Sequence, residues 1–155
     1  MRRFAVLAAL AAALVLAVFV LTGGAGASGT AAAGPTVHVI EHATTDATTD
    51  TGASGDSAGD ILTFANDVYD AANKKKVGTD QGLCIRTVAG KAYECWWTTF
   101  LAKGQITVEG PFYDAGPSTL AITGGTGAYA NARGWMGLKS RAGGTKYDFV
   151  FHLSR

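Results

Sequence analysis

The two cysteines are the residues whose spacing makes the clearest chemical prediction. Cys84 and Cys95 are the only cysteines among 155 residues. Each lies in a run rich in β-branched and aromatic side chains, 77–88 and 91–102, and the small pair Ala89-Gly90 separates the two runs. Two such runs around a short glycine-containing link predict a β-hairpin. The hairpin decides whether the two thiols can meet.

Pairing Val88 with Lys91 across this turn places Cys84 opposite Cys95, and side chains directly opposite share one face of a sheet. Opposed strand positions bring Cα atoms to about 4.5–5.5 Å, a separation that a disulfide tolerates. In an oxidising compartment an even cysteine count favours a Cys84–Cys95 disulfide. In a reducing one the two residues would be small buried hydrophobic side chains. The hairpin alone leaves both interpretations open.

A carboxylate and an amide are the next candidates for chemistry. Glu41 ends the alternating run Thr36–Glu41, and Asn66 ends the apolar run Asp60–Asn66. A carboxylate enclosed by apolar side chains can act as a base or stabilise positive charge, whereas one at an open strand end is a solvated rim charge. Asn66 could anchor a polar group or cap the turn that follows it. The sequence pattern allows both roles for each residue.

Several functional classes are not supported. His38, His42 and His152 show no metal-ligand spacing, and Ser, His and Asp show no triad order, so neither a metal site nor a hydrolase is predicted. A net charge of +1 with a pI near 7.8 gives no field that would attract nucleic acid. With 48% hydrophobic and 16% charged residues, the chain has material for one domain with one core.

The amino terminus predicts export. A positively charged segment containing Arg2 and Arg3, an apolar run 4–21 and the small-x-small tripeptide Ala25-Gly26-Ala27 form the pattern of a signal peptide spanning 1–27. The predicted location is therefore secreted, or extracellular. The alternative is an uncleaved membrane anchor, because the apolar run reaches the lower limit for spanning a bilayer. Residues 28–35 are expected to form a flexible tether before a domain at 36–155.

The positioning elements are predicted to be strands. Besides the two hairpin strands, strand patterns cover 36–41, 60–66, 105–110, 119–123, 132–139 and 145–153, with Pro111 expected to end the fifth strand. Residues 42–59 are expected to be a mobile loop and 67–76 a polar connection. Eight short strands predict an all-β fold, namely an eight-stranded antiparallel up-and-down β-barrel of the calycin-like kind. Such a barrel holds one small ligand and has no open edges.

Side-chain alternation predicts an apolar lumen. Tyr147, Phe149 and Phe151 share one face of the last strand, and Trp97 shares the face of Cys95 in the fourth. Trp96 lies on the opposite face of that strand and needs cover from a loop or another subunit. The pattern therefore predicts a homo-oligomer.

Four motifs are specific enough to indicate a family. They are Gly59-Asp60 with Phe64-Ala-Asn66, Gly82-Leu-Cys84, Val108-Glu-Gly-Pro-Phe112 and Leu120-Ala-Ile-Thr-Gly-Gly-Thr-Gly127. Their order and spacing resemble those of the plant allene oxide cyclases, and the related dirigent proteins share part of the pattern. The resemblance covers about Asp60 to Leu153 and implies a barrel, commonly trimeric, with a cofactor-free hydrophobic cavity. The Ala/Gly-rich exported chain is typical of a bacterial member.

The resemblance also implies roles for individual residues. In this family an unstable fatty-acid epoxide closes to a cyclopentenone beside a buried carboxylate, which Glu41 resembles. Asn66 resembles an asparagine that holds a water against the epoxide oxygen, and Cys84 resembles a cavity cysteine. Together with the lumen-facing aromatic residues, these positions give the expected substrate-binding set, which comprises Cys84, Trp97, Tyr147, Phe149 and Phe151.

The chain departs from the family pattern at the polar part of that site. Ala43 stands where the plant enzymes have a second asparagine, and no proline lies between Pro35 and Pro111. Three functions therefore remain open. They are a cofactor-free isomerase for stereocontrolled cyclisation or coupling, a non-catalytic binder of a hydrophobic small molecule, and a structural barrel. The discriminating feature is whether Glu41 points into the lumen.

Overall fold

The computed structural model describes residues 33–154, so the predicted signal peptide and residues 28–32 of the predicted tether lie outside the described residues. Ten strands are present: β1 (Ala33–His42), β2 (Ala47–Thr49), β3 (Ile61–Phe64), β4 (Asp67–Asp70), β5 (Lys76–Val88), β6 (Ala92–Leu101), β7 (Gly104–Tyr113), β8 (Ser118–Gly125), β9 (Arg133–Arg141) and β10 (Lys146–Ser154). Two short 3-10 turns, Gly127–Tyr129 and Ala142–Gly144, precede β9 and β10. No helix among the described residues is long and apolar enough to cross a bilayer.

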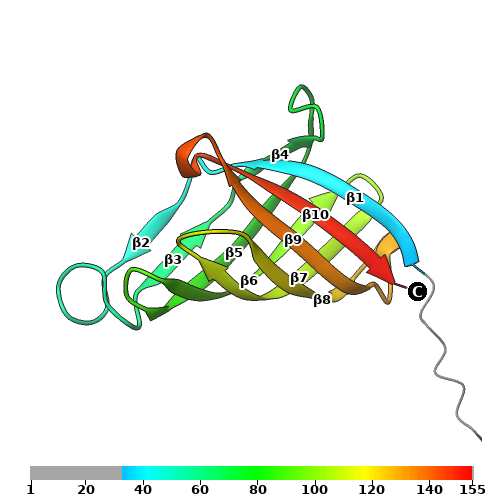
Figure 1. Cartoon of the computed structure of the whole chain (residues 1–155). Coiled ribbons are helices and arrows are strands. Elements are labelled where there is room, and N and C mark those ends of the chain that lie inside the picture. Colours follow the sequence, from blue (N-terminus) through cyan, green and yellow to red (C-terminus); the bar gives the residue numbers. More distant parts are fainter. Residues whose placement is uncertain (1–32, 155) are drawn as a thin grey trace, which may run out of the picture.

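Eight of the strands close into an antiparallel barrel (Figure 1). The ring runs β1, β10, β9, β8, β7, β6, β5, β4 and back to β1, each neighbour being hydrogen-bonded to the next. Closure leaves no open sheet edge in this ring. The predicted all-β, eight-stranded antiparallel barrel is confirmed. Strands β2 and β3 are additions, with β3 paired to the far half of β5 and reaching past one end of the barrel.

The predicted second strand, 60–66, is shorter than expected, because β3 covers only Ile61–Phe64. Strand β4 occupies Asp67–Asp70, where a polar connection was predicted, because Val68 is fully buried between β1 and β5. Strand β2 lies inside residues 42–59, so that segment is not the unstructured loop that its composition predicted. Polar composition does not prevent pairing where the partner strand supplies the hydrogen bonds.

Two strand boundaries also differ from prediction. Strand β1 begins at Ala33, so the predicted tether overlaps its start. Strand β7 continues through Pro111 to Tyr113. The pairing of β7 with β8 ends at Glu109, so Pro111 lies where β7 has only β6 as a partner. Proline has no backbone N–H, and at this position no bond to β8 is lost.

The hairpin of β5 and β6 aligns Cys84 with Cys95, as predicted, and the two form a disulfide. The turn itself was predicted wrongly, because Val88 pairs with Ala92 rather than Lys91. The loop is therefore one residue longer, and a register shift between Arg86 and Val88 compensates for it. A bulge of this kind absorbs one extra residue on one strand, so the cysteine register survives.

The barrel interior is packed with apolar side chains. The largest fully buried ones are Phe149, Phe151, Ile40, Ile106, Leu120, Met136, Val68 and Val108. On the outside, Trp96 and Trp135 remain 41% and 47% exposed. The predicted outward position of Trp96 is confirmed.

Candidate functional site

An interior cavity of about 60 Å³ is lined by both apolar and acidic side chains. Its walls come from six barrel strands, from the added strand β3 and from the β1–β2 connection, and they comprise Glu41, Asp46, Leu62, Phe64, Cys84, Cys95, Trp97, Phe112, Leu138, Tyr147 and Phe149. The aromatic residues contact one another: Trp97 meets Phe149 at 5.2 Å between ring centroids, and Phe64 meets Trp97 edge-on at 6.0 Å. The cavity is therefore an aromatic chamber with carboxylates on one part of its wall.

Six of the sequence-predicted site residues line this cavity, namely Glu41, Cys84, Cys95, Trp97, Tyr147 and Phe149. Phe151 does not. It is fully buried next to Phe149, with ring centroids 6.4 Å apart, and it fills the core instead. The last strand places alternate residues on its inner face, but only part of that face borders the cavity.

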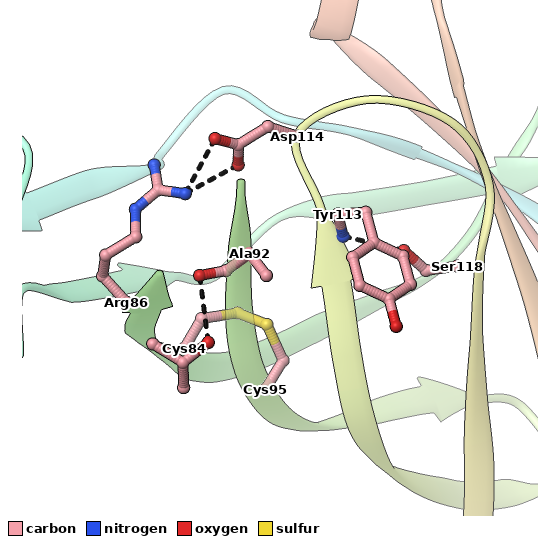
Figure 2. The surroundings of a disulfide bond; sticks show 8 residues. Cys84, Arg86, Ala92, Cys95, Tyr113, Asp114 and Ser118 are labelled. Carbon is pink, nitrogen blue, oxygen red and sulfur yellow. Dashed lines mark hydrogen bonds and ion pairs between the residues drawn. A yellow bond between two sulfur atoms is a disulfide. The ribbon is translucent and has the colours of Figure 1, made fainter. Parts of the chain in front are cut away.

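The disulfide forms part of the cavity wall and is shown with its surroundings in Figure 2. Beside it, Arg86 donates two hydrogen bonds to Asp114, at 2.7 and 2.8 Å, and its guanidinium lies 3.6 Å from the Tyr93 ring centroid. Arg86 also pairs with Asp56 at 2.7 Å. These contacts join the loops before β3 and after β7 to the hairpin and fix this side of the barrel.

Asn66 lies behind Glu41 and orients it. The Asn66 Nδ2 donates to Glu41 Oε1 at 2.9 Å and to Asp46 Oδ1 at 2.7 Å. The Asn66 Oδ1 accepts from the backbone N–H groups of Thr44 and Thr45, both at 2.9 Å, and from the Thr45 hydroxyl at 3.0 Å. Three donors on Oδ1 fix which end of the amide faces the carboxylates. Both N–H groups of the Asn66 amide are therefore used inside the protein, on Glu41 and Asp46.

Burial sets the electrostatics of this group. Glu41 is 5% exposed, and burial raises its pKa to about 7 against the opposing effect of the Asn66 hydrogen bond. Asp80, on β5, is 1% exposed, and burial together with the nearby Glu41 charge raises its pKa to about 9. Removing a carboxylate from water disfavours its charged form, and a second carboxylate nearby disfavours it further.

Sequence reasoning missed Asp46 and Asp80. Asp80 had a usable signal, because it shares the inner face of β5 with Cys84 at a spacing of four residues. Asp46 lies in a segment of Thr, Asp, Ala, Ser and Gly without periodicity, and no sequence signal points to it. Its place beside Asn66 depends on the fold of the β1–β2 connection.

Two further polar atoms stand out in the interior. The Trp97 indole Nε1 and the Thr99 hydroxyl are buried and have no hydrogen-bond partner within the described chain. Trp97 also lines the cavity. Among residues 33–154, no group of three or more His, Cys, Asp or Glu residues is arranged to hold a metal ion.

Comparison with solved structures shows the same architecture in small-molecule enzymes. A pyocyanin demethylase is 29% identical, with a TM-score of 0.66, over 76% of this chain and 100% of that chain. An exo-specific intermolecular Diels-Alderase is 14% identical, with a TM-score of 0.63 over 79% and 100% of the two chains. A pterocarpan synthase dirigent protein is 19% identical, with a TM-score of 0.60 over 76% and 94%. The last two similarities concern the fold alone.

The family model described as allene oxide cyclase matches residues 38–155, nearly the whole barrel. This agrees with the motif pattern in the sequence and with the closed barrel around an apolar cavity. The chain belongs to the allene oxide cyclase family.

Proposed function

We propose that this protein takes a hydrophobic, unsaturated small molecule into its barrel and isomerises it without a cofactor, with Glu41 as base or electrostatic stabiliser. The observation that carries the proposal is the position of Glu41. It is buried, lines an aromatic cavity and is held in one orientation by Asn66. An exposed rim carboxylate would have favoured a simple carrier.

The chemistry follows from the surroundings of the carboxylate. A pKa near 7 lets Glu41 exist in both protonation states around neutral pH, so it can accept a proton from a ligand and return it. In its charged form it stabilises positive charge that develops on a conjugated ligand, and low local polarity strengthens that effect. The faces of Trp97 and Phe149 favour the same charge.

The similar structures support small-molecule chemistry without choosing the reaction. They are a demethylase, a Diels-Alderase and a dirigent protein that is a pterocarpan synthase, and the family is named for a cyclase. Isomerisation fits Glu41 best, because one carboxylate that takes up and returns a proton needs no further reactant.

The cavity size restricts how a ligand enters. A volume of about 60 Å³ is well below the roughly 150 Å³ of a cavity that binds benzene. A ligand must therefore displace side chains of the wall. Leu62, Phe64, Phe112 and Tyr147 line the cavity and are only partly buried, so they are the wall residues that we expect to move.

A second candidate is a binder that has lost the reaction. It is favoured by Ala43, by the missing proline and by the fact that Asn66 spends both N–H groups on carboxylates. A binder needs the aromatic chamber but not an ionisable Glu41. The two candidates therefore differ in their response to a Glu41→Gln substitution.

The test combines ligand capture with turnover in the mature protein. Native mass spectrometry would record uptake from a panel of unsaturated fatty-acid epoxides and phenols, and chiral chromatography would record products. We expect Glu41→Gln to retain uptake but lower turnover at least 100-fold, the order of a general acid-base contribution. Glu109→Gln, on the outer face, is the matched control.

Unchanged turnover in Glu41→Gln would contradict the catalytic role. Uptake without turnover in the unsubstituted protein would favour the binder, and no uptake at all would remove both candidates. Uptake should also fall in Leu62→Trp, which narrows the cavity at a partly exposed position.

We also propose that the barrel is exported and self-associates as a trimer. The disulfide fits an oxidising compartment, and exposed Trp96 and Trp135 fit burial against another subunit. Fractionation of the source culture tests export, and the same native mass spectra give the subunit number.

A further inference from the structure

Asp80 is a buried acidic residue to which the proposed function gives no role. It lies on β5, and its backbone pairs with that of Asn66 in both directions, at 2.9 and 3.0 Å. Its Oδ1 also accepts the Asn66 backbone N–H at 3.2 Å. Its Oδ2 has no donor from the described chain, although the side chain is 1% exposed. A buried carboxylate oxygen without a donor is costly.

Glu41 and Asp80 are held by the same residue. Asn66 donates from its side-chain Nδ2 to Glu41 Oε1 at 2.9 Å and from its backbone N–H to Asp80 Oδ1 at 3.2 Å. Two carboxylate ions cannot hydrogen-bond to each other, because neither has a hydrogen, so a bond between these two groups needs a proton on one of them. The remaining polar surroundings are the Asp46 carboxylate, the Asn66 amide, the unpartnered Thr99 hydroxyl opposite Asp80, and Tyr147 on β10.

No cation neutralises this pair. Among the described residues, no lysine, arginine or histidine forms an ion pair with Glu41 or Asp80. Two buried carboxyl groups held on one asparagine without a cation do not both ionise at neutral pH. A proton shared between them satisfies both groups.

We propose that Asp80 is the proton-holding partner of Glu41, so that the two form a carboxyl pair with one shared proton and the charge on the cavity side. This inference rests on the proposed function. Asp80 does not line the cavity and is a positioning residue. In the singly protonated pair, Glu41 accepts a proton from a ligand C–H bond whose electron pair stays on the ligand. The doubly protonated pair then returns that proton to another atom of the same ligand, which completes an isomerisation.

The titration of Glu41 tests the pair directly. The chain contains only three glutamates, Glu41, Glu94 and Glu109. Labelling with carboxyl-13C glutamate thus gives three NMR signals, two of them from exposed residues that act as references. We expect the Glu41 signal to shift in two pH steps, because coupled acids titrate as a pair. In Asp80→Asn, whose amide can still donate to Glu41, the second step should vanish while the first remains.

Two results would overturn the pair. One is a single Glu41 step that is the same in the unsubstituted protein and in Asp80→Asn. The other is an Asp80 signal, from carboxyl-13C aspartate, that titrates near the ordinary value of about 4. If Asp80→Asn does not fold, Glu41→Gln serves instead, and there the Asp80 pKa should fall because its charged neighbour is gone.

The proposed function is tested separately from the pair, with the fluorescent conjugated fatty acid cis-parinaric acid as probe and product formation as readout. If Glu41 and Asp80 titrate as a coupled pair but the protein neither takes up nor converts the probe, the acid pair stands and its catalytic use is contradicted. If the probe is converted but Glu41 titrates independently of Asp80, the proposed function stands and the role of Asp80 is contradicted. If turnover falls at high pH in the unsubstituted protein but not in Asp80→Asn, both proposals are supported.

Discussion

At the scale of single residues, Asn66 explains how a carboxylate is kept in an apolar chamber. Its amide donates a hydrogen bond to Glu41 and holds Asp46 at the same time. The three donors on its oxygen come from Thr44 and Thr45. One buried amide thus couples the β1–β2 connection to the acid pair.

We expect Asn66→Ala to destabilise the protein by about 3 kcal/mol, because it leaves several buried or partly buried polar groups without partners. It should also raise the Glu41 pKa further, since the amide hydrogen bond lowers it. Urea unfolding and the Glu41 13C signal measure the two effects. Gln81→Ala, at an exposed position on β5, is the control. Equal stability of the two variants would contradict this role.

At the scale of elements, the β5–β6 hairpin is both the scaffold and a wall of the cavity. Its register sets Cys84 opposite Cys95 despite the longer turn. The disulfide then locks that register between two strands that also carry Asp80, Trp97 and the Arg86 contacts.

Removing the disulfide should therefore loosen the cavity wall. We expect the double variant Cys84→Ala with Cys95→Ala to lose about 2–3 kcal/mol, the loop-closure value for a loop of roughly a dozen residues. Urea unfolding with and without reductant measures the loss. The urea midpoint of the double variant should not change with reductant. The midpoint of the unsubstituted protein should fall in reductant toward the value of the variant. No shift on reduction would show that the bridge does not stabilise this fold.

At the scale of the whole molecule, barrel closure fixes the pH dependence of stability. Glu41 and Asp80 have raised pKa values in the folded state, so their stabilising contribution is full below about pH 4 and is lost as pH rises through 7 to 9. Asp70 and Asp148 have lowered pKa values, through hydrogen bonds and nearby cations, and act in the opposite sense below about pH 4.

We expect the melting temperature to be highest near pH 4 to 5 and to fall as the pH rises to about 9, because the unfolded carboxyl groups lose their protons over this range while the folded pair retains them. Thermal unfolding followed by circular dichroism across this range measures it. The variant carrying both Glu41→Gln and Asp80→Asn should show a much smaller fall over the same range. An equally steep fall in that variant would place the titrating groups elsewhere.

The sequence by itself determined the strands with strong alternation, the cysteine register, the aromatic lumen and the family. These follow from local periodicity and from motifs that a linear pattern records. It did not determine that Phe151 leaves the cavity wall, that β4 forms from a polar stretch, or that Asp46 and Asp80 join Glu41. Only closure of the barrel brings β1 beside β4 and β5, so residues 39 positions apart, Glu41 and Asp80, become neighbours. Whether an acid is solvated or buried depends on such long-range contacts, and tertiary structure alone supplies them.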